Sequence, residues 1–224
     1  PGTSGRVVVR GRTLAATPLL ARLYQGSGFR PQWTHPRQPD LLVGIATRTA
    51  DEGLEPDDYH VSTLQALLAR AAELPNDATL AADFELLLSD ALVRLAYHLR
   101  FGKVDPQKLD PSWNFSRELT LENPATWLAQ TIRAPELGET LDALRPQGPY
   151  YTGLTSALAR YRAYAATGDW PLVAEGPSLK PGATDARARL LRQRLAAEDY
   201  PAATGTADDD RYDEALVEVV RTYQ

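Results

Sequence analysis

Few residues in this 224-residue sequence have the types and spacing needed for catalysis or metal binding. The sequence has no cysteine, which excludes a thiol nucleophile, a thiolate zinc site, an iron–sulfur cluster and a disulfide. The three histidines, His35, His60 and His98, show no His-x-x-x-His or similar spacing that would place two metal ligands side by side. We therefore predict no metal site and no cofactor.

A pair of carboxylates is the main enzymatic option within the chain. Glycoside hydrolysis requires two acids about 5–10 Å apart in different environments. Asp83 and Asp90 share one side of a predicted helix but lie two turns apart, and Arg94 is spaced at i,i+4 to pair with Asp90. The serines lack a Gly-x-Ser-x-Gly elbow, and the glycines lack a phosphate-binding spacing. We predict no catalytic residue and keep a muralytic glycosidase using these acids as a second alternative.

Aromatic residues with basic neighbours are the more suggestive candidates for binding. Sugar rings stack on aromatic faces, and carboxylates of peptide stems pair with arginine. The opposing interpretation is that most of these rings pack in the core or between helices, because large aromatics mainly serve burial. The candidate contacts with peptidoglycan or a partner are Tyr97, Arg100, Lys103, Trp113, Tyr150, Tyr151, Arg192 and Arg221.

The composition places these residues in an ordinary globular protein. Apolar residues make up 43% and charged residues 24% of the chain, which are typical shares for such a protein. The net charge of -5 argues against a general nucleic-acid binder, which would show a basic face. No apolar run approaches the ~18 residues that a membrane helix needs, so we predict no membrane segment in this chain.

Apolar periodicity predicts a mainly α fold, an orthogonal or irregular helical bundle. The longest periodic stretch, residues 80–99, is apolar on most sides, which is typical of a central helix that packs against several others. Gly102 is expected to end this helix. The β-branched residues within 6–10 predict a short isolated strand or an extended arm before the helices.

Local signals predict where several helices begin and end. Gly53 is expected to be a left-handed helix stop, and Ser62 with Gln65 matches a capping box. Thr184 is expected to cap a helix whose first turn holds an acid, and the acidic run 208–210 falls where the last helix is expected to start.

Three strings resemble segments of the scaffold domain of large Gram-negative L,D-transpeptidases, and they occur in that family's order. The strings are Glu52-Gly53-Leu54-Glu55-Pro56-Asp57-Asp58-Tyr59-His60; Tyr97-His98-Leu99-Arg100-Phe101-Gly102-Lys103-Val104-Asp105-Pro106, followed by Trp113; and Ala157-Leu158-x-x-Tyr161-Arg162, followed by Trp170-Pro171, Gly176, Leu179 and Pro181-Gly182. The resemblance covers most of the chain from about Tyr24. It implies an all-helical scaffold domain over residues 17–169 and a partial peptidoglycan-binding module over 170–224. The β-branched N-terminal residues leave 1–16 as an extended arm before them.

The resemblance also implies a function for the parent enzyme. Such enzymes are periplasmic, exported and anchored in the inner membrane. Their catalytic domain uses a cysteine with a nearby histidine to form 3→3 crosslinks between peptide stems, through a thioester that an acceptor amine attacks. No catalytic residue can be transferred, because this chain has no cysteine. The implied partners are peptidoglycan or its peptide stems, the enzyme's own catalytic domain and other cell-wall synthesis proteins.

The resemblance further implies that a three-helix binding module is cut at Gln224, leaving two helices. We expect weak or absent peptidoglycan affinity and expect Leu191, Leu195, Leu216 and Val220 to pack on the scaffold or on another molecule. The first alternative to this interpretation is a freestanding periplasmic peptidoglycan-binding or adaptor protein that never had a catalytic domain.

Overall fold

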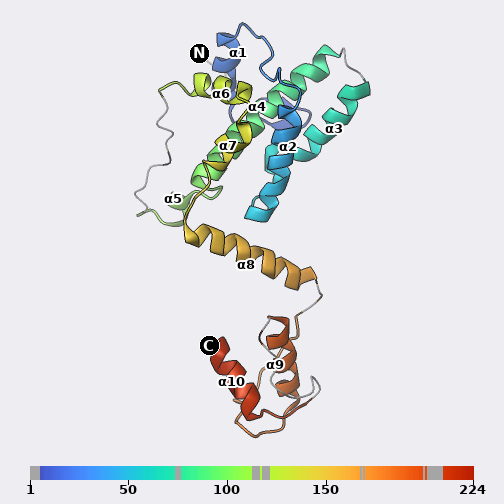
Figure 1. Ribbon diagram of the computed structural model, residues 1–224, viewed down its shortest axis with the longest axis vertical. Helices are drawn as coiled ribbons and strands as arrows, with labels where there is room; N and C mark the ends of the chain where they lie inside the picture. The colour runs from blue at the N-terminus through green and yellow to red at the C-terminus, as the bar shows by residue number, and fades with distance from the viewer. Residues whose placement is uncertain are drawn as a thin grey trace. The chain divides into compact units, whose positions relative to one another are not determined.

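The computed structural model is mainly helical, which confirms the predicted fold class (Figure 1). It describes residues 6–73, 77–112, 117, 122–166, 168, 170–198, 200 and 209–224, with the side chains of 71–73 left out. The chain divides into two compact units, residues 1–155 and 156–224.

The described elements are mostly short helices. The first unit contains β1 (Val8–Val9), β2 (Arg12–Thr13), α1 (Thr17–Gly26), α2 (Gln38–Arg48), the 3₁₀ helices η1 (Thr49–Glu52) and η2 (Pro56–Tyr59), α3 (Val61–Glu73), α4 (Ala78–Phe101), α5 (Pro106–Leu109), α6 (Pro124–Arg133) and α7 (Leu137–Asp142). The division between the units falls inside α8 (Pro149–Ala166), and the second unit continues with α9 (Ala186–Ala197) and α10 (Glu214–Tyr223).

The helix α4 forms the centre of the first unit, as its apolar pattern predicts. It contacts α1, α2, α3 and η2, and Figure 1 shows it (green) running beside α2 and α3. Leu87, Leu88 and Leu95 are fully buried, and each such side chain contributes roughly 1.5–3 kcal/mol by leaving water. Asp77 caps the start of α4, and Gly102, with a φ of 78°, follows its last turn.

The predicted N-terminal strand is not isolated, because it pairs with a second strand. Arg10 and Gly11 both have positive φ angles, 50° and 77°, and such a two-residue turn matches the twist of a β-hairpin. Val9 and Leu14 are buried in the core, and Arg10 Nε lies 2.6 Å from Asp83 Oδ2 on α4. The hairpin was missed because each strand has only two residues.

The predicted stop at Gly53 is confirmed, but the predicted capping box is wrong. Gly53 has a φ of 79°, and the next residue's N–H returns to the Thr49 carbonyl at 3.1 Å. The helix α3 starts at Val61, so Ser62 lies inside its first turn. The carboxylate of Asp57 instead accepts the Ser62 N–H at 3.0 Å.

Both predicted helix starts in the second unit are displaced along the chain. Asp185, not Thr184, caps α9 by accepting the Arg187 N–H at 2.9 Å. Asp213, not the run 208–210, caps α10 by accepting the Leu216 N–H at 2.9 Å. Thr184 is extended because it forms an antiparallel bridge with Arg211, which moves the cap one residue onward.

The apolar faces of α9 and α10 pack on each other. Ala188, Leu195 and Leu216 are buried, with Leu191 and Val220 partly buried against them. This corrects the expectation that these leucines need the scaffold or another molecule as cover. The second unit therefore has a small core of its own.

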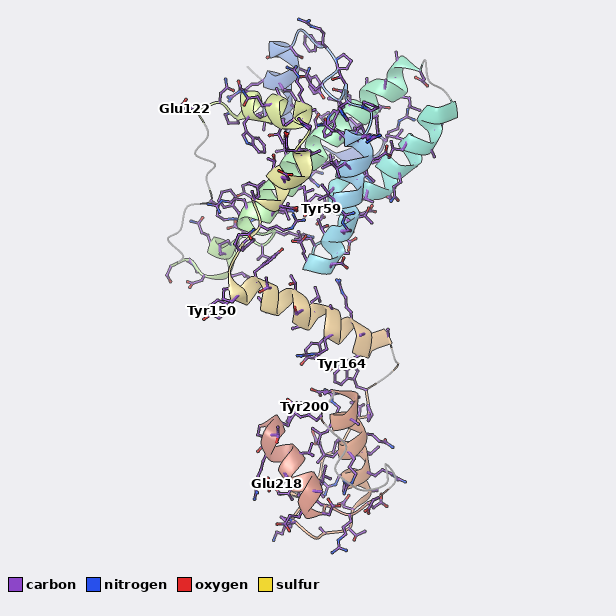
Figure 2. All side chains as sticks on the ribbon, in the orientation of Figure 1. Tyr59, Glu122, Tyr150, Tyr164, Tyr200 and Glu218 are labelled. Carbon is purple, nitrogen blue, oxygen red and sulfur yellow. The ribbon has the colours of Figure 1, made fainter. Side chains whose placement is uncertain are left out.

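The helix α8 has no buried residue. Leu154 is 70% exposed and Tyr161 is 50% exposed. Figure 2 shows Tyr150 at the start of this helix, where it is 87% exposed. Among the helices of the described residues, none combines the length and apolar character needed to cross a membrane.

Candidate functional site

A cleft of about 470 Å³ in the first unit gathers the polar side chains that could bind a ligand. It lies between the residues before α1, the helix η2 and the C-terminal part of α4. Its lining residues are Ala15, Ala16, Asp58, Val93, Arg94, Tyr97, His98 and Lys103. Two of the predicted contact residues, Tyr97 and Lys103, are thus brought together.

Asp90 contacts three residues that line this cleft, Ala15, Ala16 and Arg94, and connects three parts of the chain. Its side chain is fully buried, and Oδ1 accepts hydrogen bonds from the N–H groups of Ala15 and Ala16, both at 2.8 Å. Oδ2 lies 2.9 Å from His60 Nε2 and 3.3 Å from Arg94 Nε, which confirms the predicted i,i+4 pair. Asp90 therefore holds the segment before α1 against α4 and does not face a substrate.

Opposite charges meet at the rim of the cleft. Lys103 Nζ lies 2.5 Å from Asp58 Oδ2, and both side chains are partly exposed. Arg94 Nη1 donates to the Asp58 carbonyl at 2.5 Å. These contacts hold η2 against the end of α4. The Lys103–Asp58 pair at the rim is the ion pair that a charged ligand could replace.

A buried tyrosine supports the histidine of the cleft. Tyr59 is fully buried within the first unit (Figure 2), and its hydroxyl lies 2.9 Å from His98 Nδ1. Burial raises the pKa of Tyr59, with nearby Asp58 and Glu52 adding to the effect. Burial also lowers the pKa of His98, which favours the neutral imidazole.

The aromatic ring of Tyr97 is covered on part of its surface. Its centroid lies 5.0 Å from that of Phe101, and the guanidinium carbon of Arg117 lies 5.2 Å from the Tyr97 centroid. Arg117 also donates to the Gly102 carbonyl at 2.6 Å. The exposed Arg100 lies 5.9 Å from the Phe101 centroid and does not line the cleft.

Two other predicted contact residues lie around the start of α8. The Tyr151 hydroxyl donates to the Glu52 carboxylate, which Arg145 Nε also binds through contacts of 3.0 and 2.9 Å. Burial and the Glu52 carboxylate raise the pKa of Tyr151 to about 12. Tyr151 is thus engaged within the fold, whereas Tyr150 is exposed. Trp113 lies outside the described residues.

The last two candidates, Arg192 and Arg221, belong to the second unit. Arg192 is buried, and its Nη2 donates to the Arg211 carbonyl at 2.8 Å and lies 2.9 Å from Asp213 Oδ2. Arg221 is exposed and pairs with Glu218. Arg192 therefore ties α9 to the start of α10, and neither arginine is among the residues that line the cleft.

The acids proposed for glycoside hydrolysis are engaged in other contacts. Asp83 pairs with Arg10, and Asp90 is bonded on both oxygens. Asp58 is the one acid among the described lining residues of the cleft. Among the described residues, no three His, Asp or Glu side chains gather as a metal ion would require.

A second cavity, of about 670 Å³, is an apolar groove between α1, the loop after it and the start of α4. Its polar side chains include Glu85, whose Oε1 accepts the Trp33 N–H at 3.3 Å and the Tyr24 hydroxyl at 3.2 Å. Burial raises the pKa of Glu85. This groove offers fewer polar groups to a ligand than the cleft does.

Sequence reasoning missed Asp58, Arg94 and His98 as cleft residues. A signal was available for two of them, because Asp58 lies in the first string and His98 in the second. The fold brings these two strings together at the cleft, which their spacing in the sequence does not reveal.

Comparison with known proteins identifies a domain family over the larger part of the chain. A family model described as a scaffold domain matches residues 18–158, which is more than half of the chain and includes Asp58, Arg94, Tyr97, His98 and Lys103. No curated protein and no solved structure gives a match. The chain therefore belongs to the scaffold-domain family.

Proposed function

We propose that this chain is the non-catalytic scaffold portion of a periplasmic L,D-transpeptidase, an exported enzyme anchored in the inner membrane. Support comes from the scaffold-domain match and from the three ordered strings. The observation that carries the proposal is that the strings 52–60 and 97–106 line the same cleft. A shared cleft supports a binding role for both strings, in addition to packing the helices.

In this proposal the cleft contacts a peptide stem of peptidoglycan. Lys103 and Arg94 offer charged donors for carboxylates, and Tyr97 offers a ring edge for apolar contact. The second unit is the beginning of a peptidoglycan-binding module, and the crosslinking cysteine belongs to a catalytic domain of the parent protein. The scaffold thus positions substrate or partner proteins and carries out no chemistry.

A titration with soluble muropeptides tests the proposal. We expect disaccharide tetrapeptides to shift the amide signals of ¹⁵N-labelled protein around the cleft, with weak but saturable binding. Lys103→Ala should weaken binding about fivefold, because one partly exposed charge contact is lost. Lys108→Ala is the matched control, since Lys108 is 83% exposed and does not line the cleft.

Two results would contradict the proposal. One is the absence of any shift around the cleft at millimolar muropeptide. The other is release of soluble fragments from purified sacculi by the protein, which would establish the muralytic alternative. The sequence of the parent gene distinguishes the proposal from the adaptor alternative. If the proposal is right, the gene should encode a cysteine-containing domain after Gln224.

A further inference from the structure

We propose that the cleft recognises an α-amino-acid head group, an ammonium and a carboxylate on one carbon. This inference rests on the proposed function, because it names the part of a peptide stem that the cleft would hold. It follows from the charge balance of the lining and from the hydrogen-bonding state of His98.

The charged groups of the cleft are balanced in pairs. Arg94 faces Asp90 at 3.3 Å, and Lys103 faces Asp58 at 2.5 Å. The Arg94 pair is fixed, because Asp90 is fully buried and bonded on both oxygens. The Lys103 pair is partly exposed and can open, with side-chain exposures of 46% and 28%.

Opening the rim pair suits only a ligand with both charges. A simple anion that bound Lys103 would leave Asp58 without its partner, and a simple cation on Asp58 would leave Lys103 without its partner. A charge that loses its partner in a partly desolvated site is costly. A zwitterion replaces the Lys103–Asp58 ion pair with two ion pairs, one to each side chain, so that neither side chain is left without a partner.

The histidine adds a fixed donor to this pair. The buried Tyr59 hydroxyl has His98 Nδ1 as its partner, and a buried O–H group that donated to nothing would be unfavourable. The phenol therefore donates, Nδ1 is the acceptor, and a neutral imidazole must carry its hydrogen on Nε2. No described residue is bonded to Nε2, and His98 lines the cleft.

Tyr59 is consequently a positioning residue that sets what the cleft can recognise. The lining then offers the His98 Nε2–H and Lys103 as donors for a carboxylate and Asp58 as an acceptor for an ammonium. Free amino acids have this head group, and so does a peptide that ends in a diamino dicarboxylic acid joined through only one of its two amino groups.

Three matched ligands test the inference by calorimetry or NMR titration. L-Leucine carries both charges, L-leucinamide lacks the carboxylate, and N-acetyl-L-leucine lacks the ammonium. We expect leucine to bind at least about fivefold more tightly than either analogue, the equivalent of about one net hydrogen bond or ion pair. A fourth ligand, a stem peptide whose last residue keeps a free head group, shows whether the natural ligand is a peptide or a free amino acid. Tighter binding of this peptide than of leucine indicates a peptide ligand, and equal binding indicates a free amino acid.

Variants separate the two halves of the head group. Tyr59→Phe should reduce the preference for leucine over leucinamide about fivefold and shift the His98 ring ¹⁵N signals away from the Nε2–H form. Asp58→Asn should reduce the preference for leucine over N-acetylleucine. Tyr151→Phe is the matched control, because its hydroxyl binds Glu52 and it does not line the cleft.

The outcomes distinguish this inference from the proposed function. Equal binding of leucine and its analogues, or unchanged preferences in Tyr59→Phe, would overturn the inference. Muropeptide binding without leucine binding would also overturn it while sparing the proposed function. Leucine binding without muropeptide binding would support the head-group site and remove the peptidoglycan role.

Discussion

At the scale of single residues, Asp90 has the largest consequences for stability. It is fully buried and accepts hydrogen bonds from the N–H groups of Ala15 and Ala16, and it contacts His60 and Arg94. Removing its carboxylate leaves the buried His60 and the part-buried Ala15 and Ala16 N–H groups without this acceptor. A buried donor that loses its acceptor costs more than the original bond contributes.

We predict that Asp90→Ala lowers the free energy of unfolding by about 3–5 kcal/mol, the usual cost of breaking a buried charge pair. Urea denaturation followed by tryptophan fluorescence measures the loss. Asp83→Ala is the control, because the Arg10–Asp83 pair is partly exposed and should contribute less than about 1 kcal/mol. Similar small losses in both variants would show that Asp90 is not a central contact.

Asp90 also illustrates the limit of sequence reasoning at this scale. Its pairing with Arg94 was predictable because the i,i+4 spacing is local. Its burial was not predictable, because it depends on His60 and Ala15, which lie 30 and 75 residues away along the chain. The same holds for His98, whose partner Tyr59 is 39 residues away.

At the scale of elements, the start of α3 depends on a residue outside the helix. Asp57 accepts the Ser62 N–H, and Arg12 of β2 binds both the Asp57 carboxylate at 3.1 Å and the Ser62 hydroxyl at 2.6 Å. The contacts join the hairpin, η2 and α3. His60, the residue between η2 and α3, has a φ of 60°, an uncommon backbone conformation for a residue other than glycine.

We predict that Asp57→Ala destabilises the protein by about 1 kcal/mol, as expected for a lost helix cap. The Ser62 hydrogen bonds and then Arg12 lower the pKa of Asp57 below 3.8, so the folded state favours the carboxylate. The stabilisation is therefore present above pH 3.8 and is lost as the pH falls through the lower, folded-state pKa. Unfolding curves at pH 7 and pH 3 measure this difference.

The control for this prediction is Gln65→Ala, because Gln65 is the partner of Ser62 in the capping box that the sequence predicted. It should change stability by less than about 0.5 kcal/mol, because Gln65 is exposed on the helix surface. If Gln65→Ala lowered the free energy of unfolding more than Asp57→Ala does, the Ser62–Gln65 capping box would be supported instead.

Helix positions were more predictable than helix starts. The stretch 80–99 was predicted from periodicity, and α4 spans Ala78–Phe101. Caps shifted by a few residues because several Asp, Ser and Thr side chains stand near each start, and tertiary contacts select among them. The start of α6 is less ambiguous, because Pro124 limits where the helix can begin and the Asn123 side chain before it accepts the Thr126 N–H at 3.1 Å.

At the scale of the whole molecule, the two units have cores of very different size. The first has an extensive apolar core around α4, and the second has Ala188, Leu195 and Leu216 as its buried apolar residues among those described. The spatial division inside α8 was not predictable from motifs. The module boundary at 169–170, drawn from the resemblance, stays a prediction.

We predict that Leu216→Ala unfolds the second unit while the first remains folded. The substitution removes about 2–5 kcal/mol, which is large for so small a core. Hydrogen exchange followed by mass spectrometry should show lost protection in α9 and α10 with α4 unchanged. Leu172→Ala, at a leucine that is 83% exposed, is the control, and lost protection in α4 would contradict independent units.

The Asp90 contacts also bear on how the chain folds. The bonds from the Ala15 and Ala16 N–H groups close loops of 75 and 74 residues, far longer than those within the α3–α4 hairpin. Closing such loops costs backbone entropy before any contact forms. We expect the hairpin of helices to form early and the N-terminal strands to dock late, so that the floor of the cleft is completed only near the end of folding.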